Sequence, residues 1–153
     1  MKLLIFLFLL FSAPSAIRTR DCVCVTDPHP SEEKAKEIRR LAYDNAPAIF
    51  TGKVVRLDAY AVTFRVEKRW KGDLGSEVVL STGAVPGFDG TPLPEECSYQ
   101  FRLDQEYLVY GYGAGNKLKA NICLTFQIKD MAVEEKWLDE IHPHESINEK
   151  PNE

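Results

Sequence analysis

The stretch Cys22-Val23-Cys24, in which two cysteines flank one apolar residue, decides the fold. The other two cysteines of the chain, Cys97 and Cys123, lie far downstream. In an exported chain, four cysteines predict two disulfides. A bridge between the two cysteines of the Cys-x-Cys would close a very tight ring, so we set that pairing aside. Both remaining pairings tie the N-terminal segment to Cys97 and Cys123, and each bridge stabilises the fold by about 4 kcal/mol in the chain-entropy model.

Export is predicted from residues 1–16, MKLLIFLFLLFSAPSA, which have the layout of a secretory signal peptide. Lys2 supplies the positive n-region, residues 3–11 the apolar region and residues 12–16 a cleavage zone of small residues. An apolar region of this length is too short to cross a bilayer, which needs about 20 residues. No other stretch is long or apolar enough to do so. We therefore expect a secreted, extracellular protein with one domain over residues 17–141.

Composition argues against several functions. A formal charge of -4 with no long basic run argues against nucleic acid as a partner. The histidines are His29, His142 and His144, and no nucleophile–base pair stands out. We therefore expect no enzyme and no cofactor of its own. A zinc site made of the four cysteines is the weaker alternative to disulfides, because zinc ribbons prefer Cys-x2-Cys spacing.

Two amphipathic helices are predicted near the ends of the domain. Ser31 fits an N-cap, and acidic residues follow it in the first turn, where they suit the helix dipole. Apolar residues at helical spacing continue this helix to about Asp44-Asn45, before a proline. A second helix is predicted over residues 131–141. The tail, residues 142–153, is polar and is expected to be disordered.

Between the helices the apolar period changes from helical to alternating. Strands are predicted over Ala48–Leu57, where Gly52 marks a bulge or bend, and from Val62 to Trp70. Three further strands are predicted over residues 76–82, 107–111 and 118–122. Residues 83–96, GAVPGFDGTPLPEE, are predicted to form a long loop of functional or mobile character. Five short strands flanked by two helices favour a mainly β fold, a Greek-key barrel of the OB type.

Several motifs, taken in order, resemble the netrin module, and specifically the N-terminal domain of tissue inhibitors of metalloproteinases. They are Cys22-Val-Cys24, Phe50-Thr-Gly-Lys-Val54, Val62-Thr-Phe-Arg-Val66, Trp70-Lys-Gly72, Cys97-Ser-Tyr-Gln-Phe101, Tyr107-Leu-Val-Tyr110 and Cys123. The resemblance covers about residues 22–141. It implies a five-stranded OB barrel with two disulfides, Cys22–Cys97 and Cys24–Cys123.

The resemblance also implies inhibition of a secreted zinc metalloproteinase. The N-terminal edge and the flank of Cys97 would form an inhibitory ridge that enters the protease cleft like a substrate. Besides Cys97, its residues are Cys22, Val23, Cys24, Val25, Glu95, Glu96 and Ser98. As the first residue of the mature chain, Cys22 would chelate the protease zinc through its α-amino group and carbonyl oxygen. An α-amino pKa near 8 makes loss of that proton inexpensive at neutral pH. Val23 would enter the pocket that normally takes the substrate residue after the scissile bond.

Departures from the family pattern favour an alternative, an extracellular netrin-type binding module without inhibitory activity. Residues 17–21, IRTRD, stand between the predicted cleavage site and Cys22 and would block chelation. Thr26 replaces a proline usual in the inhibitors, and a third disulfide and a separate C-terminal domain are missing. Such a module would bind matrix, a protein or a glycosaminoglycan. Six basic residues could form a surface for a glycosaminoglycan: Lys53, Arg56, Arg65, Lys68, Arg69 and Lys71. The alternative is that they form an ordinary solvated strand face.

Overall fold

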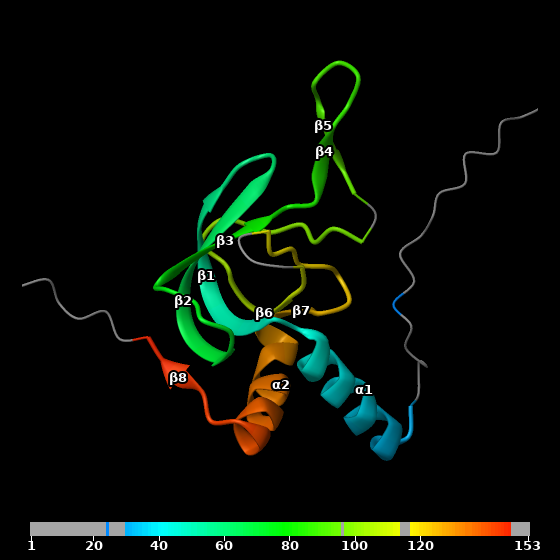
Figure 1. Cartoon of the computed structure of the whole chain (residues 1–153), viewed down its shortest axis with the longest axis vertical. Coiled ribbons are helices and arrows are strands. Elements are labelled where there is room, and N and C mark those ends of the chain that lie inside the picture. Colours follow the sequence, from blue (N-terminus) through cyan, green and yellow to red (C-terminus); the bar gives the residue numbers. More distant parts are fainter. Residues whose placement is uncertain (1–23, 25–29, 96, 114–116, 148–153) are drawn as a thin grey trace, which may run out of the picture.

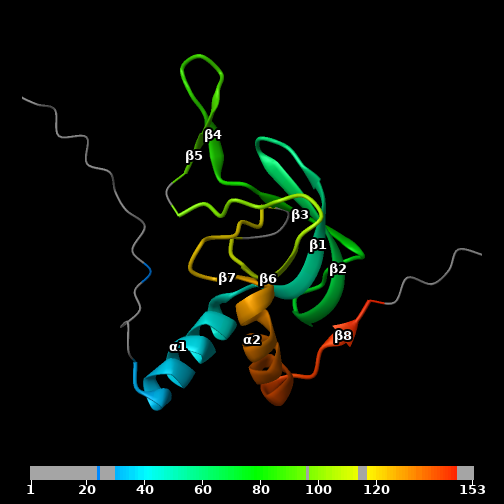
Figure 2. The same ribbon diagram turned by 180° about the vertical axis from the view of Figure 1, so that it is seen from behind.

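The computed structural model describes residue 24 and residues 30–95, 97–113 and 117–147. Two helices, α1 (Glu32–Asn45) and α2 (Ile128–Ile141), lie next to each other below a curved sheet, as Figures 1 and 2 show from opposite sides. The strands are β1 (Ala48–Leu57), β2 (Ala61–Lys71), β3 (Glu77–Ser81), β4 (Ala84–Pro86), β5 (Pro92–Pro94), β6 (Glu106–Gly111), β7 (Thr125–Gln127) and β8 (Glu145–Ser146). The prediction of a mainly β fold with two flanking helices is confirmed.

Antiparallel pairing orders the main sheet β3-β2-β1-β6-β7, and β8 pairs with β2. Beyond this ladder, Lys119 makes a parallel bridge to Ser81 at the end of β3 and an antiparallel bridge to Tyr112 just after β6. These are isolated bridges rather than a continuous strand. The sheet is therefore not closed into a barrel, and an OB-type barrel is not established by it.

Gly52 lies at a bulge between β1 and β2, as its sequence position predicts. Thr51 is opposite Lys68 and Gly52 is opposite Val66, so Glu67 is left without an opposite residue. A Cβ atom at Gly52 would lie 2.6 Å from the carbonyl oxygen of Arg65. Glycine is therefore required here by the close approach of the neighbouring backbone, and the bulge bends the strand pair.

The inner face of the sheet carries the larger core. Phe50 of β1, Phe64 of β2 and Tyr107 of β6 are almost completely buried there. The Phe64 ring meets Phe50, Phe101 and Tyr107 edge-on, with centroids 5.5, 5.1 and 6.3 Å apart. Edge-on aromatic pairs of this kind add to the stabilisation from buried area. This cluster holds β1, β2 and β6 together.

The other face of the sheet packs against the two helices. Because side chains alternate along a strand, Ile49 points away from the inner core and joins Leu108 of β6. Both contact a cluster that includes Leu138 of α2 and the partly buried Ala42 and Tyr43 of α1. The helices thus cover the sheet on the side away from β4 and β5 (Figure 1).

Helix α1 begins and ends where its sequence predicts. The Ser31 side chain accepts a hydrogen bond from the Lys34 backbone N–H at 3.3 Å, which makes it the N-cap. The helix ends at Asn45, and Ala46 adopts an extended conformation before Pro47. Helix α2 begins at Ile128, three residues before the predicted start at 131. No helix of the described residues is long and apolar enough to cross a membrane.

The predicted strand over residues 118–122 is wrong. The chain makes isolated bridges at Lys119 and Asn121, and the last strand of the sheet path is β7, after Cys123. The reason is local, because the Asn121 side-chain oxygen accepts hydrogen bonds from the backbone N–H groups of Cys123 and Leu124, each at 3.0 Å. An asparagine that bonds its own following backbone makes a turn, which ends an extended run.

The expectation of a disordered tail from residue 142 is wrong for residues 142–147, while residues 148–153 lie outside the described part. Strand β8 pairs with Lys68 and Arg69 of β2. The Ile147 N–H donates to the Glu67 carbonyl at 3.2 Å, and its side chain packs against the inner core. The polar composition of the tail hid one apolar residue, Ile147, and two ion-pairing side chains, His144 and Glu145, which help to hold it.

Candidate functional site

The Cys24–Cys123 disulfide anchors the N-terminal segment, as the resemblance implies. Its two Cα atoms lie 5.4 Å apart, and the bridge spans 99 positions of the chain. Cys97 is also disulfide-bonded. The partner implied for it, Cys22, lies outside the described residues, so the Cys22–Cys97 pairing stays a prediction. One of the two predicted bridges is therefore confirmed as a pair.

The flank of Cys97 lies against the segment that carries Cys123. The Ile122 N–H donates to the Cys97 carbonyl at 3.1 Å, and Ser98 bridges Asn121. Cys97 has a φ of 66°, so the chain turns sharply there. The fold thus places Cys24, through its bond to Cys123, next to the turn that leads into Ser98.

An ion pair ties the other side of this turn to the same segment. Lys119 Nζ lies 2.9 Å from Glu95 Oε2, and this hydrogen bond raises the pKa of Lys119. Glu95 is exposed, whereas Ser98 and Cys24 are half-buried. Of the predicted ridge, the structure therefore brings together Cys24, Glu95, Cys97 and Ser98. Its remaining residues, Cys22, Val23, Val25 and Glu96, lie outside the described residues.

A hairpin rises directly from this ridge, where the sequence predicts only a long loop. The Glu95 N–H donates to the Gly83 carbonyl at 3.0 Å, and β4 and β5 then pair antiparallel. The hairpin projects from the body of the protein on the side opposite the helices (Figures 1 and 2). An Asp89-Gly90 dipeptide between two short runs is a hairpin signal that could have found it. Three prolines at strand positions obscured that signal.

The hairpin exposes apolar side chains and carries no cation. Phe88 at its tip is 115% exposed, and Val85 and Leu93 are about half exposed. Residues 83–98 contain no lysine or arginine. The Thr91 side chain and N–H donate to Asp89, and these hydrogen bonds lower the pKa of the Asp89 carboxyl. The hairpin is therefore an apolar projection with a negative charge at its tip.

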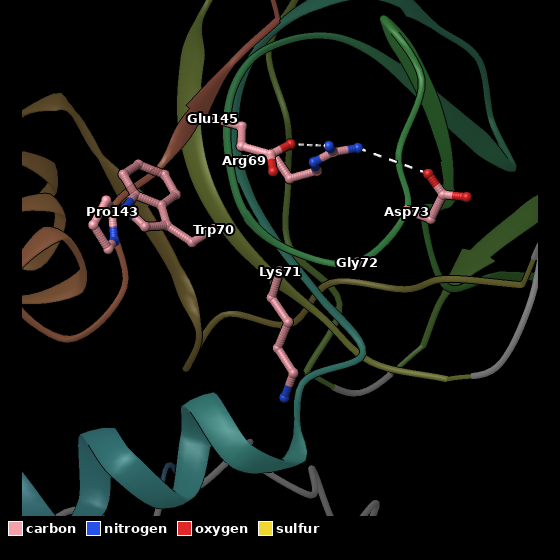
Figure 3. Close-up of a pocket in the computed structure, with 7 residues that line it drawn as sticks. All are labelled: Arg69, Trp70, Lys71, Gly72, Asp73, Pro143 and Glu145. Carbon is pink, nitrogen blue, oxygen red and sulfur yellow. Dashed lines mark hydrogen bonds and ion pairs between the residues drawn. The ribbon is translucent and has the colours of Figure 1, made fainter.

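A pocket of about 330 Å³ lies beside β8, and Figure 3 shows the residues that line it. Arg69 points across it between Glu145 and Asp73 and forms ion pairs with both. The Arg69 guanidinium also donates to the Leu74 carbonyl at 2.9 Å. Two carboxylates and a carbonyl already satisfy this cation, and Lys71, which also lines the pocket, donates to the Tyr43 and Asp44 carbonyls, so both lining cations are already engaged within the protein. Its side chains hold β8 on β2.

Half of the cations of the predicted glycosaminoglycan surface form ion pairs with carboxylates within the protein. Four of its six cations have acidic or carbonyl partners. These contacts are Lys53–Asp104 (3.3 Å), Lys68–Glu135 (2.6 Å), Arg69–Glu145, and Lys71 to the Tyr43 and Asp44 carbonyls (2.6 and 3.0 Å). Lys68, Arg69 and Lys71 attach α2, β8 and α1 to the sheet, and Lys53 contacts the turn before β6. These contacts reduce the number of cations available to a polysaccharide.

Within the described residues, no group of three or more His, Cys, Asp or Glu side chains is placed to hold a metal ion. No family model matches the chain, and no curated protein matches it either. The resemblance to the netrin module therefore rests on the ordered motifs and on the Cys24–Cys123 bond alone.

Proposed function

We propose that this protein is a secreted inhibitor of zinc metalloproteinases that inserts its Cys22-to-Val25 edge into the protease cleft. The observation that supports it most is the Cys24–Cys123 disulfide, packed beside the turn from Glu95 to Ser98. An inhibitor that occupies a cleft must hold its backbone in one conformation. The disulfide at Cys24 and the backbone hydrogen bond of the Cys97 flank would supply that rigidity before binding, and this would lower the entropy cost of association.

The proposed chemistry lies at the first cysteine. The free α-amino nitrogen and carbonyl oxygen of Cys22 would occupy the open coordination position of the protease zinc and displace its water. An amide nitrogen does not replace the amine, because its lone pair is delocalised into the carbonyl. The mature chain must therefore begin at Cys22 for this mechanism, and removal of residues 17–21 is part of the proposal.

The fold part of the proposal is an OB-type arrangement of β1, β2, β3, β6 and the segment around Lys119. Two features support it. The Ser81 N–H donates to the Leu118 carbonyl at 2.8 Å across a parallel bridge, and Tyr112 and Lys119 exchange backbone hydrogen bonds of 3.0 and 2.9 Å. Lys119 thus lies between the end of β3 and the end of β6, where a fifth strand would complete the ring.

A second candidate function is an extracellular protein-binding module without inhibition. Two observations favour it. Residues 17–21 precede Cys22 in the sequence, and the β4–β5 hairpin exposes Phe88 to solvent. Such a module would bind through the hairpin whether or not Cys22 has a free amine.

The test compares two exported chains, one that begins at Cys22 and one with a single alanine before Cys22. We expect the first to inhibit at least one purified secreted zinc metalloproteinase and the second to be weaker by about a hundredfold or more, since its Cys22 nitrogen is an amide. Mass spectrometry of the naturally exported protein gives its first residue. Equal inhibition by both chains would refute chelation, and no inhibition by either would leave the binding module as the better account.

A further inference from the structure

We propose that the β4–β5 hairpin is a second anchor of the inhibitor, which seats the Phe88 ring in an apolar pocket of the protease outside the active-site cleft. This inference rests on the proposed function and deepens it, because it names a residue that would select among target proteases. It concerns the tip of the hairpin, beyond the ridge predicted from the sequence.

Exposure of Phe88 is the first argument. A phenylalanine that is 115% exposed contributes nothing to the stability of its own fold. Val85 and Leu93, which are opposite each other across the hairpin, are also about half exposed. Aromatic side chains in fully desolvated pockets are frequent hot spots of protein interfaces. The apolar surface therefore suits a partner rather than the fold.

The hairpin is built to hold its tip in one conformation. Pro86 and Pro92 are paired across it, and the Gly87 N–H donates to the Thr91 carbonyl at 2.8 Å. Gly90 has a φ of +82°, which glycine adopts without strain. Prolines and turn hydrogen bonds reduce the conformations open to the free hairpin, so ordering it on binding costs little.

Position and charge indicate the partner. The hairpin is continuous with the ridge, since Gly83 at its base receives the Glu95 N–H and a Cβ there would contact Ser98 at 3.1 Å. A protein that receives the ridge therefore lies within reach of the tip. Asp89 near the tip is acidic and residues 83–98 carry no cation, so the pocket has a neutral or basic rim. The same charge disfavours an anionic membrane.

The experiment measures inhibition constants of the chain that begins at Cys22 against a panel of purified secreted zinc metalloproteinases. The variant is Phe88→Ala, and the matched control is Leu41→Ala, which removes a 53% exposed leucine from α1 at the far end of the molecule. Both variants are expected to have the same unfolding temperature as the parent chain, since neither side chain is buried. We expect Phe88→Ala to weaken inhibition about tenfold or more for at least one enzyme, and Leu41→Ala to leave it unchanged.

The possible outcomes are distinct. If the parent chain inhibits and Phe88→Ala inhibits every enzyme equally well, the second anchor is refuted while the proposed function stands. If the parent chain inhibits no enzyme, the proposed function fails and the anchor fails with it. Sedimentation with phosphatidylcholine vesicles is the remaining arm. If the parent chain binds these vesicles and Phe88→Ala does not, Phe88 inserts into a lipid surface, and the proposal of a protease pocket is overturned.

Discussion

At Gly52 the fold leaves room for a hydrogen atom and nothing larger. A Cβ there would lie 2.6 Å from the Arg65 carbonyl oxygen and 3.3 Å from the Phe64 Cβ, both in the paired strand. We expect Gly52→Ala to lower the free energy of unfolding by about 1–3 kcal/mol, because the strand pair must move apart to admit the methyl group. Urea denaturation measures the change.

Gly75 provides the matched control for that substitution. A Cβ at Gly75 would meet its nearest neighbour, the Glu77 carbonyl oxygen, at 3.8 Å, an ordinary contact. Gly75→Ala should therefore change the free energy of unfolding by less than about 0.5 kcal/mol. Equal losses in the two variants would contradict the role of close approach at Gly52.

Glu134 is the buried carboxylate that joins α1, α2 and β6. It is 5% exposed, accepts a hydrogen bond from the Tyr110 hydroxyl at 2.6 Å and lies 3.2 Å from Arg39 Nε. Burial, and then the hydrogen bond to Glu134, raise the pKa of the Tyr110 hydroxyl, so it stays protonated and donates. The carboxylate is thus compensated from two elements, as a buried charge requires.

We expect Glu134→Ala to lower the free energy of unfolding by about 3 kcal/mol, because it removes the carboxylate that accepts from the Tyr110 hydroxyl and pairs with the Arg39 guanidinium. Thermal or urea unfolding measures the loss. Tyr110→Phe removes the hydrogen bond to Glu134 and should cost about 1 kcal/mol. Glu37→Ala, at an exposed position of α1, is the control. If the free energy of unfolding is unchanged in Glu134→Ala, the contacts of Glu134 with Tyr110 and Arg39 make no net contribution to stability.

At the scale of elements, the C-terminal segment is held on the sheet by a titratable cluster. Asp139 of α2 accepts from Trp70 Nε1 at 2.7 Å and lies 2.8 Å from His144 Nδ1. Burial raises the pKa of Asp139, but the hydrogen bonds from His144 and Trp70 outweigh it, and the pKa lies below its ordinary value. Glu145, which follows His144, forms a further ion pair with Arg69 of β2.

A lowered carboxyl pKa stabilises the folded state above the ordinary pKa near 4, and this stabilisation is lost as pH falls through the lower folded value. We therefore expect β8 to loosen on acidification below about pH 4. Hydrogen exchange of the Ile147 amide, which donates to Glu67, measures the loosening. Asp139→Asn should weaken its protection at neutral pH and flatten its pH dependence. The Val66 amide, bonded to the Ser76 carbonyl, serves as the internal reference.

Two results would contradict the predicted release of β8 at low pH. Protection of Ile147 that stays constant down to pH 2 would show that Asp139 does not hold the strand. Equal loss of protection at Ile147 and Val66 would show global unfolding instead of release of β8.

At the scale of the whole molecule, the Cys24–Cys123 disulfide links the N-terminal segment to the stretch just before β7. Cys24 and Cys123 are 99 positions apart, so their bridge removes a large loop entropy from the unfolded chain. We expect the double variant Cys24→Ser, Cys123→Ser to lose about 4 kcal/mol of unfolding free energy in urea denaturation. Both cores lie within residues 42–147, so the variant should keep its circular dichroism spectrum.

The companion measurement is the inhibitory activity of the same double variant. If the proposed function holds, loss of the anchor at Cys24 should weaken inhibition even where the protein remains folded. Full inhibition by a folded double variant would show that the bond is not what positions the edge.

Sequence patterns predicted the elements that local chemistry controls. Ser31 caps α1, Gly52 marks the bulge, and the alternation of β1 separates Ile49 from Phe50 on opposite faces. The same local reasoning failed where a side chain redirects the backbone. Asn121 turns the chain before a fifth strand forms, and the prolines around Asp89-Gly90 concealed a hairpin.

The sequence by itself determined the mainly β class and the two helices, because capping and hydrophobic periodicity act over short stretches of chain. It also determined that Cys24 is tied by a disulfide to a distant part of the chain, because a bridge to Cys22 would close a very tight ring and the other two cysteines both lie far downstream. Only the tertiary structure decided which charges are free. Arg39 and Lys68 look like solvated cations in the sequence, yet each is paired with a carboxylate of α2. Tertiary contacts also placed Phe88 on a projecting hairpin beside the ridge, since that depends on how residues 83 and 95 meet.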